Sequence, residues 1–226
     1  HPDFELDHLA WKSTLLRHMI GLKKPAQGDV YYDGTPFWQS DDAVRQEKLR
    51  SFGVLFQSGA LWSSMTLEEN VSLVLGEYTD FPPDEIRAIA RLKLALVGLK
   101  GFEGYYPAEI SGGMCKRAGL ARALALDPDV LFFDEPSAGL DPISSRNLDE
   151  LILQLRDSLG ATFVVVTHEL ASIFTIADNS VFLDPLTRTM RAKGNPRDLL
   201  KHSDDPVVQR FLTRGEDPPV SRHGNL

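Results

Sequence analysis

The sequence is poor in cysteine and in positive charge, and it contains no long apolar run. Cys115 is the only cysteine among the 226 residues, which excludes an intrachain disulfide framework and suits a reducing cytosol. No apolar run approaches the ~18 residues that a membrane-spanning helix needs. The first residues carry acids, unlike the basic and then apolar start of a secretory signal. We therefore expect any membrane role to be peripheral.

The charge balance is acidic. Lys and Arg number 24 against 32 Asp and Glu, which gives a net charge of −8. Such a chain has no general attraction for nucleic-acid backbones or anionic lipid surfaces, although a local basic patch stays open. Hydrophobic residues make up 42% and charged residues 25%, the composition of an ordinary globular protein. We expect a folded domain without a broad nucleic-acid-binding face.

Apolar strand patterns alternate with helical patterns along much of the chain. Helices are expected at 144–159 and 170–177, each between two strands. Strands separated by helices indicate a parallel sheet with crossover connections. The expected strands are 52–56, 130–133, 162–167 and 181–183, after a short strand at 29–32.

A block of helices is expected between the strands at 52–56 and 130–133. Thr66 and Glu69 form a capping box, and Pro83 suits the first turn of a second helix. Ser111 is expected to cap a third helix that runs to Leu126. Two further helices are expected at 13–22 and 206–212.

Two adjacent carboxylates follow the apolar strand at 130–133. Asp134 suits Mg²⁺, which takes few protein carboxylates and keeps waters and phosphates as its other ligands. Glu135, aimed differently by the next backbone position, could polarise an attacking water. The alternative is that both are solvated loop residues or helix caps.

Polar residues recur at other loop positions. Ser111-Gly112-Gly113 opens a helix, where free N–H groups and the dipole favour an anion, or where the serine is simply a cap. Gln57 and His168 each follow a strand, and a histidine there can equally be structural. Asp141 ends a tight turn after the carboxylate pair.

In order and spacing these elements resemble the conserved motifs of ABC transporter ATPase subunits. The resemblance covers about 12–212 and implies an α/β fold, a P-loop NTPase-like, mostly parallel sheet core with an inserted ABC-type α-helical subdomain. It implies one domain, with the core at 12–57 and 127–192, the helical subdomain at 58–126 and a C-terminal tail at 193–226. The matching elements are Lys12-Ser13-Thr14, Gln57, Ile110 to Met114, Asp134-Glu135, Ser137 to Asp141 and His168.

Within that superfamily the chain looks like the ATPases of bacterial lipid-transport systems, which maintain outer-membrane lipid asymmetry or work with mammalian-cell-entry domain proteins. The residues that carry this are Phe56 to Leu61, the signature ending in Met114, and Asp205 to Leu212. Lys116 and Arg117 behind the signature are expected to be a solvated helix-surface pair without chemistry.

The resemblance implies that ATP and Mg²⁺ are the cofactors. Lys12 would neutralise the β- and γ-phosphates, and Thr14 would belong to the same phosphate site. Ser13 and Asp134 would hold Mg²⁺, and Gln57 would sense both the ion and the attacking water. Each of these residue types suits phosphoryl transfer, which asks chiefly for positioning and charge stabilisation.

The same resemblance implies a site shared by two subunits arranged head to tail. Glu135 would be the catalytic base and His168 would contact the γ-phosphate. Asp141 would help communicate across the dimer. Ser111, Gly112 and Gly113 would bind the γ-phosphate of the ATP held mainly by the partner subunit.

Further partners are implied by the family. They are integral membrane permease subunits, contacted through a groove that includes 58–75, and indirectly a substrate-binding lipid-transfer protein, with no nucleic acid. The expected location is the cytoplasmic face of the inner (cell) membrane. Lipid as the transported substrate is implied by the resemblance alone.

The phosphate loop departs from the family pattern. The motif G-x-x-x-x-G-K-[ST] needs its glycines because they let consecutive N–H groups wrap the phosphates. Lys12 and Ser13 are present, but Leu6 and Trp11 occupy the two glycine positions, and no glycine precedes Gly21.

Two explanations of this departure stay open: a degenerate ATPase, or a fragment whose first eleven residues do not represent the native amino-terminal part. Phe4 lies too close to Lys12 to be the family's adenine-stacking aromatic. An inactivated site would be free to lose Gln57, Glu135 and His168, so their presence favours the fragment. The start at His1 instead of methionine agrees.

Three other classes of protein are alternatives to this function. A non-catalytic partner subunit would contribute its signature without binding ATP itself, and an ABC ATPase for another substrate would share every motif named above. A DNA-repair or chromosome-structure ATPase would insert long heptad arms, and nothing in 58–126 sustains three heptads.

Overall fold

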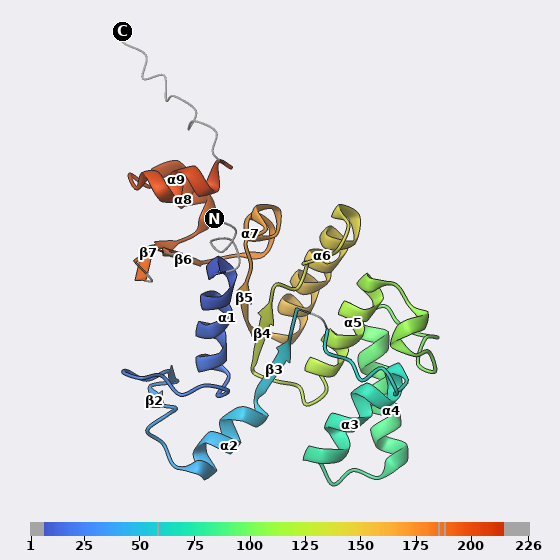
Figure 1. The fold of residues 1–226 in the computed structure, drawn as a ribbon. Helices are drawn as coiled ribbons and strands as arrows, with labels where there is room; N and C mark the ends of the chain where they lie inside the picture. Colours follow the sequence, from blue (N-terminus) through green and yellow to red (C-terminus); the bar gives the residue numbers. More distant parts are fainter. Residues whose placement is uncertain (1–6, 58, 185, 188, 215–226) are drawn as a thin grey trace. The chain divides into compact units, whose positions relative to one another are not determined.

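The computed structural model describes residues 7–57, 59–184, 186–187 and 189–214, with no side-chain description for 7–11. These residues divide into two compact units, 1–167 and 168–226. Each unit is taken by itself below, and Figure 1 labels their elements.

A parallel three-stranded sheet is the centre of the first unit, as the alternating pattern predicted. Its order is β3 (Phe52–Leu55), β4 (Val130–Asp134) and β5 (Thr162–Val166), with β4 in the middle. In the register, Val54 lies opposite Phe132 and Phe132 lies opposite Val164. Among the described strands, β5 pairs with β4 alone. The central strand is buried, which is what a parallel sheet asks of its apolar run.

Helix α1 (Asp7–Met19) covers one face of this sheet. Leu16 and Ile20 are buried against Phe132, and Val164 and Val166 of β5 pack on the same cluster. Leu16 and Ile20 lie four residues apart, on one side of a helix. The helix begins six residues before the expected Ser13, because Asp7 to Lys12 contain neither glycine nor proline to stop it.

The helices inserted between β3 and β4 form as predicted. Thr66 caps α3 (Leu67–Tyr78) with a complete capping box, and α4 (Pro83–Leu96) begins at the expected proline. A short 3₁₀ turn, η1 (Pro107–Glu109), leads to α5 (Gly112–Ala123), which ends three residues before the expected Leu126. Helix α6 (Pro142–Leu159) then connects β4 to β5 and ends at Gly160 in the left-handed conformation.

One helix of the first unit was not expected from the sequence. After the two-residue strands β1 (Tyr31–Tyr32) and β2 (Thr35–Pro36), α2 (Asp42–Arg50) is capped by Asp41 and has no buried residue. Its polar sequence carries no apolar stripe, so no helical period could be read from it.

The second unit corrects one prediction. β6 (Ser180–Asp184), expected in the parallel sheet, pairs antiparallel with β7 (Thr189–Gly194), a strand that the sequence pattern did not reveal. Since β7 returns after a short connection, a hairpin satisfies the backbone of β6. Asp184 and Asp205 both bind Arg191. The helices are α7 (Leu170–Ile176), α8 (Pro196–His202) and α9 (Pro206–Leu212).

Across the described part of the chain, no helix combines the length and the apolar character needed to cross a bilayer.

Candidate functional site

The carboxyl end of β4 presents the two predicted carboxylates in different settings. Asp134 is the last residue of the strand and shares the α1 face with Phe132, because side chains alternate along a strand. Glu135 is only 4% exposed, and its N–H donates to the carbonyl oxygen of Val166 at 2.8 Å. Its backbone is left-handed, with φ of 48°. The turn therefore sends two neighbouring carboxylates in separate directions.

Helix α1 brings Lys12 and Ser13 to these carboxylates. The Ser13 Oγ donates a hydrogen bond of 2.8 Å to Asp134 Oδ1, across 121 positions of sequence. Burial lowers the pKa of the Lys12 ammonium, and the nearby carboxylate of Glu135 opposes that shift. A hydroxyl oxygen beside a carboxylate oxygen is the donor set that Mg²⁺ takes when nucleotide phosphates and water complete its shell. The residues present thus fit that ion.

Few protein ligands for a metal ion gather at this site in the described part of the chain. Within the described residues, no group of three or more His, Cys, Asp or Glu side chains is placed to hold a metal ion. An ion at Ser13 and Asp134 would therefore depend on oxygens from the nucleotide and solvent, as Mg²⁺ commonly does in phosphate-binding sites.

The described residues before Lys12, 7–11, are helical and do not form a phosphate loop. Trp11 lies inside α1, and its N–H, like those of Lys12 and Ser13, comes after the first four of the helix. Such N–H groups bond to carbonyls four residues earlier and are not free to wrap a phosphate. Leu6 and Phe4, which the sequence interpretation also used, lie outside the described residues.

The signature residues form a helix N-terminus beside the turn that follows β4. Ser111 caps α5 by accepting from the Met114 N–H at 3.2 Å, and Gly112 is exposed. A side chain at Gly113 would meet Ser144 of α6 at 3.6 Å. A hollow of about 340 Å³ adjoins them, with Ser111, Gly113 and Arg117 in its lining.

Asp141 is the N-cap of α6. Its carboxylate accepts from the N–H groups of Ile143 and Ser144, both at 3.0 Å. Hydrogen bonds from the Ser144 side chain and backbone lower the pKa of Asp141. This cap fixes the end of the turn that begins at Glu135.

The other predicted site residues are Gln57, Thr14 and His168. Gln57 follows β3 by two residues with an exposed side chain, and Thr14 lies on α1 next to Ser13. His168 follows β5 by two residues, is exposed, and is the first residue of the second unit. The roles assigned to these three residues stay predictions.

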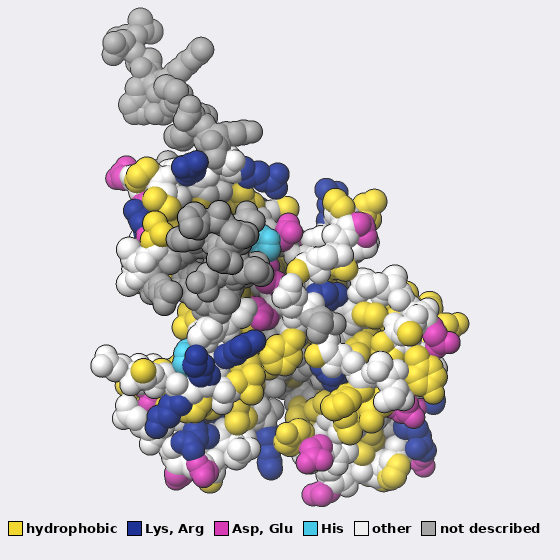
Figure 2. All heavy atoms as spheres, viewed as in Figure 1, with side chains coloured by type: hydrophobic (Ala, Val, Ile, Leu, Met, Phe, Trp, Pro, Cys, Tyr) yellow, Lys and Arg dark blue, Asp and Glu magenta, His cyan; other side chains and the backbone are white. Residues whose placement is uncertain are grey.

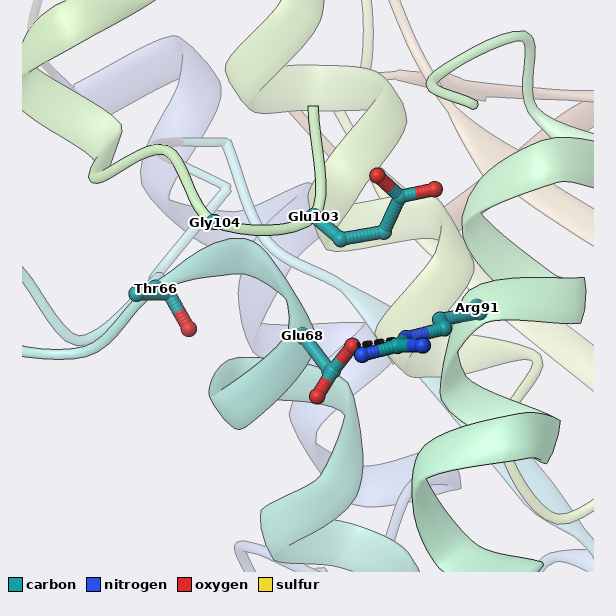
Figure 3. Close-up of a pocket in the computed structure, with 5 residues that line it drawn as sticks. All are labelled: Thr66, Glu68, Arg91, Glu103 and Gly104. Atoms are coloured by element: carbon teal, nitrogen blue, oxygen red, sulfur yellow. Dashed lines mark hydrogen bonds and ion pairs between the residues drawn. The ribbon is translucent and has the colours of Figure 1, made fainter. Parts of the chain in front are cut away.

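A second hollow, of about 410 Å³, lies among the inserted helices. Figure 3 shows Glu68 of α3 facing Arg91 of α4, with the carboxylate of Glu103 above them. Arg91 Nε donates to Glu68, which raises the pKa of the guanidinium. Thr66 and Gly104 complete the lining. The lining of this hollow therefore contains two acidic side chains and one basic side chain.

Sequence reasoning missed Lys116. It was expected to be solvated, but it is 6% exposed, and its ammonium donates to the carbonyl oxygen of Gln57. Its position in the sequence could have predicted this burial, because Lys116 lies in α5 close to the buried Ala118, Gly119 and Leu120.

The geometry of β4, α1 and α5 agrees with a comparison of the sequence with family models. The model of the ABC transporter family matches residues 10–138. This chain belongs to the ABC transporter family. The match includes the Lys12–Ser13 pair, Gln57, the signature and the carboxylates after β4.

Curated relatives with known names agree. The "Probable ribonucleotide transport ATP-binding protein mkl" of Mycobacterium tuberculosis is 44% identical over 92% of this chain, which spans only 57% of that protein's length. The "Intermembrane phospholipid transport system ATP-binding protein MlaF" is 40% identical in Haemophilus influenzae and 38% identical in Escherichia coli, again over 92% of this chain. The chain spans 78% and 77% of those two proteins.

Solved structures of ABC cassettes share the fold. A dimeric post-hydrolysis state of the ATP-binding cassette MJ0796, bound to ADP and Pi, matches with a TM-score of 0.72 and 29% identity, over 81% of this chain and 80% of that one. CbiO1 from Clostridium perfringens, part of the ABC transporter complex CbiONQ, matches with a TM-score of 0.75 and 27% identity, over 90% and 79%. The α/β P-loop NTPase fold implied by the sequence is confirmed.

Proposed function

We propose that this chain is the ATP-binding and hydrolysing part of an ABC transporter subunit that powers phospholipid transport through partner membrane subunits. One observation carries the ATPase proposal: Ser13 and Asp134, far apart in sequence, share a hydrogen bond of 2.8 Å directly beside the buried Glu135. Two oxygens for Mg²⁺ next to a carboxylate that can take a proton from water are the parts of an ATP-hydrolysing site.

The chain's own groups divide the work. Lys12 supplies positive charge toward the β- and γ-phosphates, and Ser13 and Asp134 would hold Mg²⁺, which would supply further charge stabilisation there. Glu135 takes the proton of the attacking water. Gln57 orients that water. His168 contacts the γ-phosphate, and Thr14 belongs to the same phosphate site as Lys12. Charge stabilisation at fixed positions is the larger part of such catalysis.

A second ATPase subunit is part of the proposal. Ser111, Gly112 and Gly113 face outward at the start of α5, where N–H groups and the helix dipole attract an anion. They would bind the γ-phosphate of ATP held by the partner, and Asp141 would relay closure. The dimeric cassette structures of MJ0796 support this arrangement.

The lipid substrate and the membrane partners rest on the relatives. The proteins named MlaF belong to phospholipid transport systems, whereas the name of Mkl gives ribonucleotides, so phospholipid is proposed first and another substrate second. Apolar side chains gather over α3 and α4 on the face shown in Figure 2. The exposed large apolar residues of α3, of α4 and of their connection are Leu73, Tyr78, Phe81, Leu92 and Leu96. Together with the hollow lined by Glu68 of α3 and Arg91 of α4, they suit a membrane subunit at the cytoplasmic face of the cell membrane.

A Gly112→Asp variant tests the ATPase proposal. It places a carboxylate where the partner's γ-phosphate would sit, so ATP-dependent dimerisation of the full-length protein should be lost while the monomer still folds. Sedimentation with Mg·ATP, with Glu135→Gln added to block turnover, measures this. Gly104→Asp, at an exposed loop glycine with open space around its Cβ position, is the control. A dimer unchanged by Gly112→Asp would leave Ser111 as a helix cap only, and would contradict a nucleotide site shared by two subunits.

The lipid proposal has its own experiment. The full-length protein with its membrane subunits, reconstituted in vesicles that carry a fluorescent phospholipid, should move that lipid between bilayers only with Mg·ATP. The same vesicles loaded with a ribonucleotide should show no ATP-dependent transport. The reverse pattern would replace phospholipid by the second candidate.

A further inference from the structure

The signature helix α5 and strand β3 approach each other at the level of their backbones. A side chain at Gly53 of β3 would lie 2.3 Å from the carbonyl oxygen of Ala123. A side chain at Gly119 of α5 would lie 2.9 Å from the carbonyl oxygen of Gly59. Contacts this close leave no room for sliding, because a Cβ atom essentially never comes within 3.0 Å of such an atom. Helix α5 is thus fitted against β3 and the residues after it.

Two basic side chains of α5 bind the carbonyl oxygens of those same residues. Lys116 Nζ donates to Gln57, and Arg122 donates to Ala60 at 2.6 Å and to Gly59 at 3.2 Å. We call Gln57, Gly59 and Ala60 the Gln57 segment. All three of its carbonyl oxygens are therefore held by cations that come from one helix.

The free-energy cost of burying these two cations indicates a role beyond packing. Burial lowers the pKa of both the Lys116 ammonium and the Arg122 guanidinium, and only the carboxylate of Glu135 opposes it for Lys116. A buried cation bonded to a neutral carbonyl costs more than an apolar side chain of similar volume. Lys116 therefore bonds to the Gln57 segment and also lies close enough to Glu135 to feel its charge.

We propose that Lys116 is a positioning residue, which together with Arg122 fixes the Gln57 segment to the signature helix so that Gln57 and the N-terminus of α5 move as one body. This rests on the proposed function, in which Gln57 orients the attacking water and Ser111 to Gly113 meet the partner's nucleotide. Closure of the dimer on the start of α5 then places Gln57 in the same movement.

Hydrogen exchange, measured without nucleotide, tests whether Lys116 and Arg122 hold the Gln57 segment on α5. The N–H of Gly59 bonds to the carbonyl of Phe56 at 2.8 Å and reports opening of the Gln57 segment. A hydrogen bond from a charged donor contributes enough that its loss should speed this exchange roughly 10- to 100-fold in a Lys116→Met variant. Lys116→Arg, which keeps a charged donor, should restore the protection.

Lys93→Met is the matched control. Lys93 is also a buried lysine of the inserted helices, with 5% exposure, but its ammonium pairs with Asp127. Its loss should destabilise the fold without selective exchange at Gly59. Should Lys116→Met fail to fold, Arg122→Gln, which frees only the carbonyls of Gly59 and Ala60, gives the same readout. Equal protection of Gly59 in the Lys116 and Lys93 variants would overturn the proposal.

Kinetics provide the second arm, on the full-length protein. Lys116→Met should lower kcat about tenfold or more, because Gln57 is misplaced. KM for ATP should be nearly unchanged, because the phosphates are still held. Lys116→Arg should recover most of the lost kcat. A variant that instead raises KM alone would overturn the proposal. If the unmodified protein does not hydrolyse ATP, the proposed function fails. The exchange experiment still tests whether Lys116 and Arg122 hold the Gln57 segment.

Discussion

The end of β4 and the start of α1 supply the two halves of the candidate nucleotide site, and they differ in how far they are built. At β4, Asp134 and Glu135 are buried and aimed by the sheet, and Ser13 is bonded to Asp134. At α1, the N–H groups of Trp11, Lys12 and Ser13 come after the first four of the helix, where such groups bond to carbonyls four residues earlier. Among the described residues, the carboxylate half is therefore more fully formed than the phosphate half.

This difference shows that the two halves are determined separately. The position of Asp134 follows from the register of β4 between β3 and β5. It also follows from the packing on Phe132 of Leu16 in α1 and of Ile20 directly after that helix. None of those contacts needs a glycine loop. The contact between Ser13 and Asp134 therefore forms while residues 7–12 are helical, a conformation that does not wrap phosphates.

The largest effect is expected from restoring the phosphate half. The 226-residue chain should not bind Mg·ATP measurably at millimolar nucleotide, whereas a version with an upstream strand and glycines at positions 6 and 11 should bind it. Each N–H contact to a charged phosphate contributes roughly 1.5–3 kcal/mol, so several together change affinity by orders of magnitude. Calorimetric titration with a non-hydrolysable analogue measures both forms, and Lys12→Ala in the restored form is the control. Comparable binding by the two forms would mean that Lys12 and its helix suffice.

The second effect concerns the carboxylate half. In the restored protein, Glu135→Gln should retain ATP binding and lower steady-state hydrolysis by roughly 10²- to 10⁴-fold, the range expected when a general base is lost. Phosphate release and equilibrium binding separate the two quantities. Glu150→Gln, at an exposed position of α6, should leave both unchanged. Near-normal turnover in Glu135→Gln would assign the base elsewhere.

A smaller effect is expected at the contact that joins the halves. Ser13→Ala removes the hydroxyl that donates to Asp134, and the Mg²⁺ dependence of nucleotide binding in the restored protein should weaken about tenfold, as for one hydrogen bond to a charged group. Titration of binding against Mg²⁺ measures the shift. Ser40→Ala, whose hydroxyl donates only to the Pro36 carbonyl in the structure, serves for comparison. An unchanged Mg²⁺ titration would make the Ser13 contact structural.

The smallest effect is expected where the turn after β4 ends. Asp141→Ala removes the cap of α6 and should cost about 1 kcal/mol of unfolding free energy, whereas Asp141→Asn, which keeps a side-chain acceptor, should cost much less. Urea unfolding of the 226-residue chain measures this without nucleotide. Equal stability of all three forms would separate Asp141 from the fold and leave dimer communication as its role.

Local patterns made β4 and its carboxylates predictable from the sequence. An apolar run, Val130 to Phe133, followed by two acids, carries both its structure and its chemistry in neighbouring residues. The caps at Thr66 and Ser111 are local in the same way, and both were confirmed. The placement of Ser13 on Asp134 agrees with the metal assignment that the resemblance implied, which stays a prediction.

The features that could not be predicted depend on distant contacts. β6 has the apolar character of a sheet strand, but its pairing is decided by β7, whose sequence shows little alternation. Helix α2 buries nothing and so carries no period. Lys116 appeared to be a surface residue because lysine usually is one, and only the close approach of α5 to β3 reveals the carbonyl that it binds.

The left-handed backbone of Glu135 lowers the stability of the fold at the residue that is the proposed base. Such a conformation costs a residue with a side chain on the order of 1–3 kcal/mol, and glycine adopts it without that penalty. A Glu135→Gly chain should therefore gain unfolding free energy while it loses its proposed base. Selection for thermal robustness alone would remove the carboxylate, so a laboratory search for stabilised variants of this protein should recover glycine at 135 unless hydrolysis is required of every survivor.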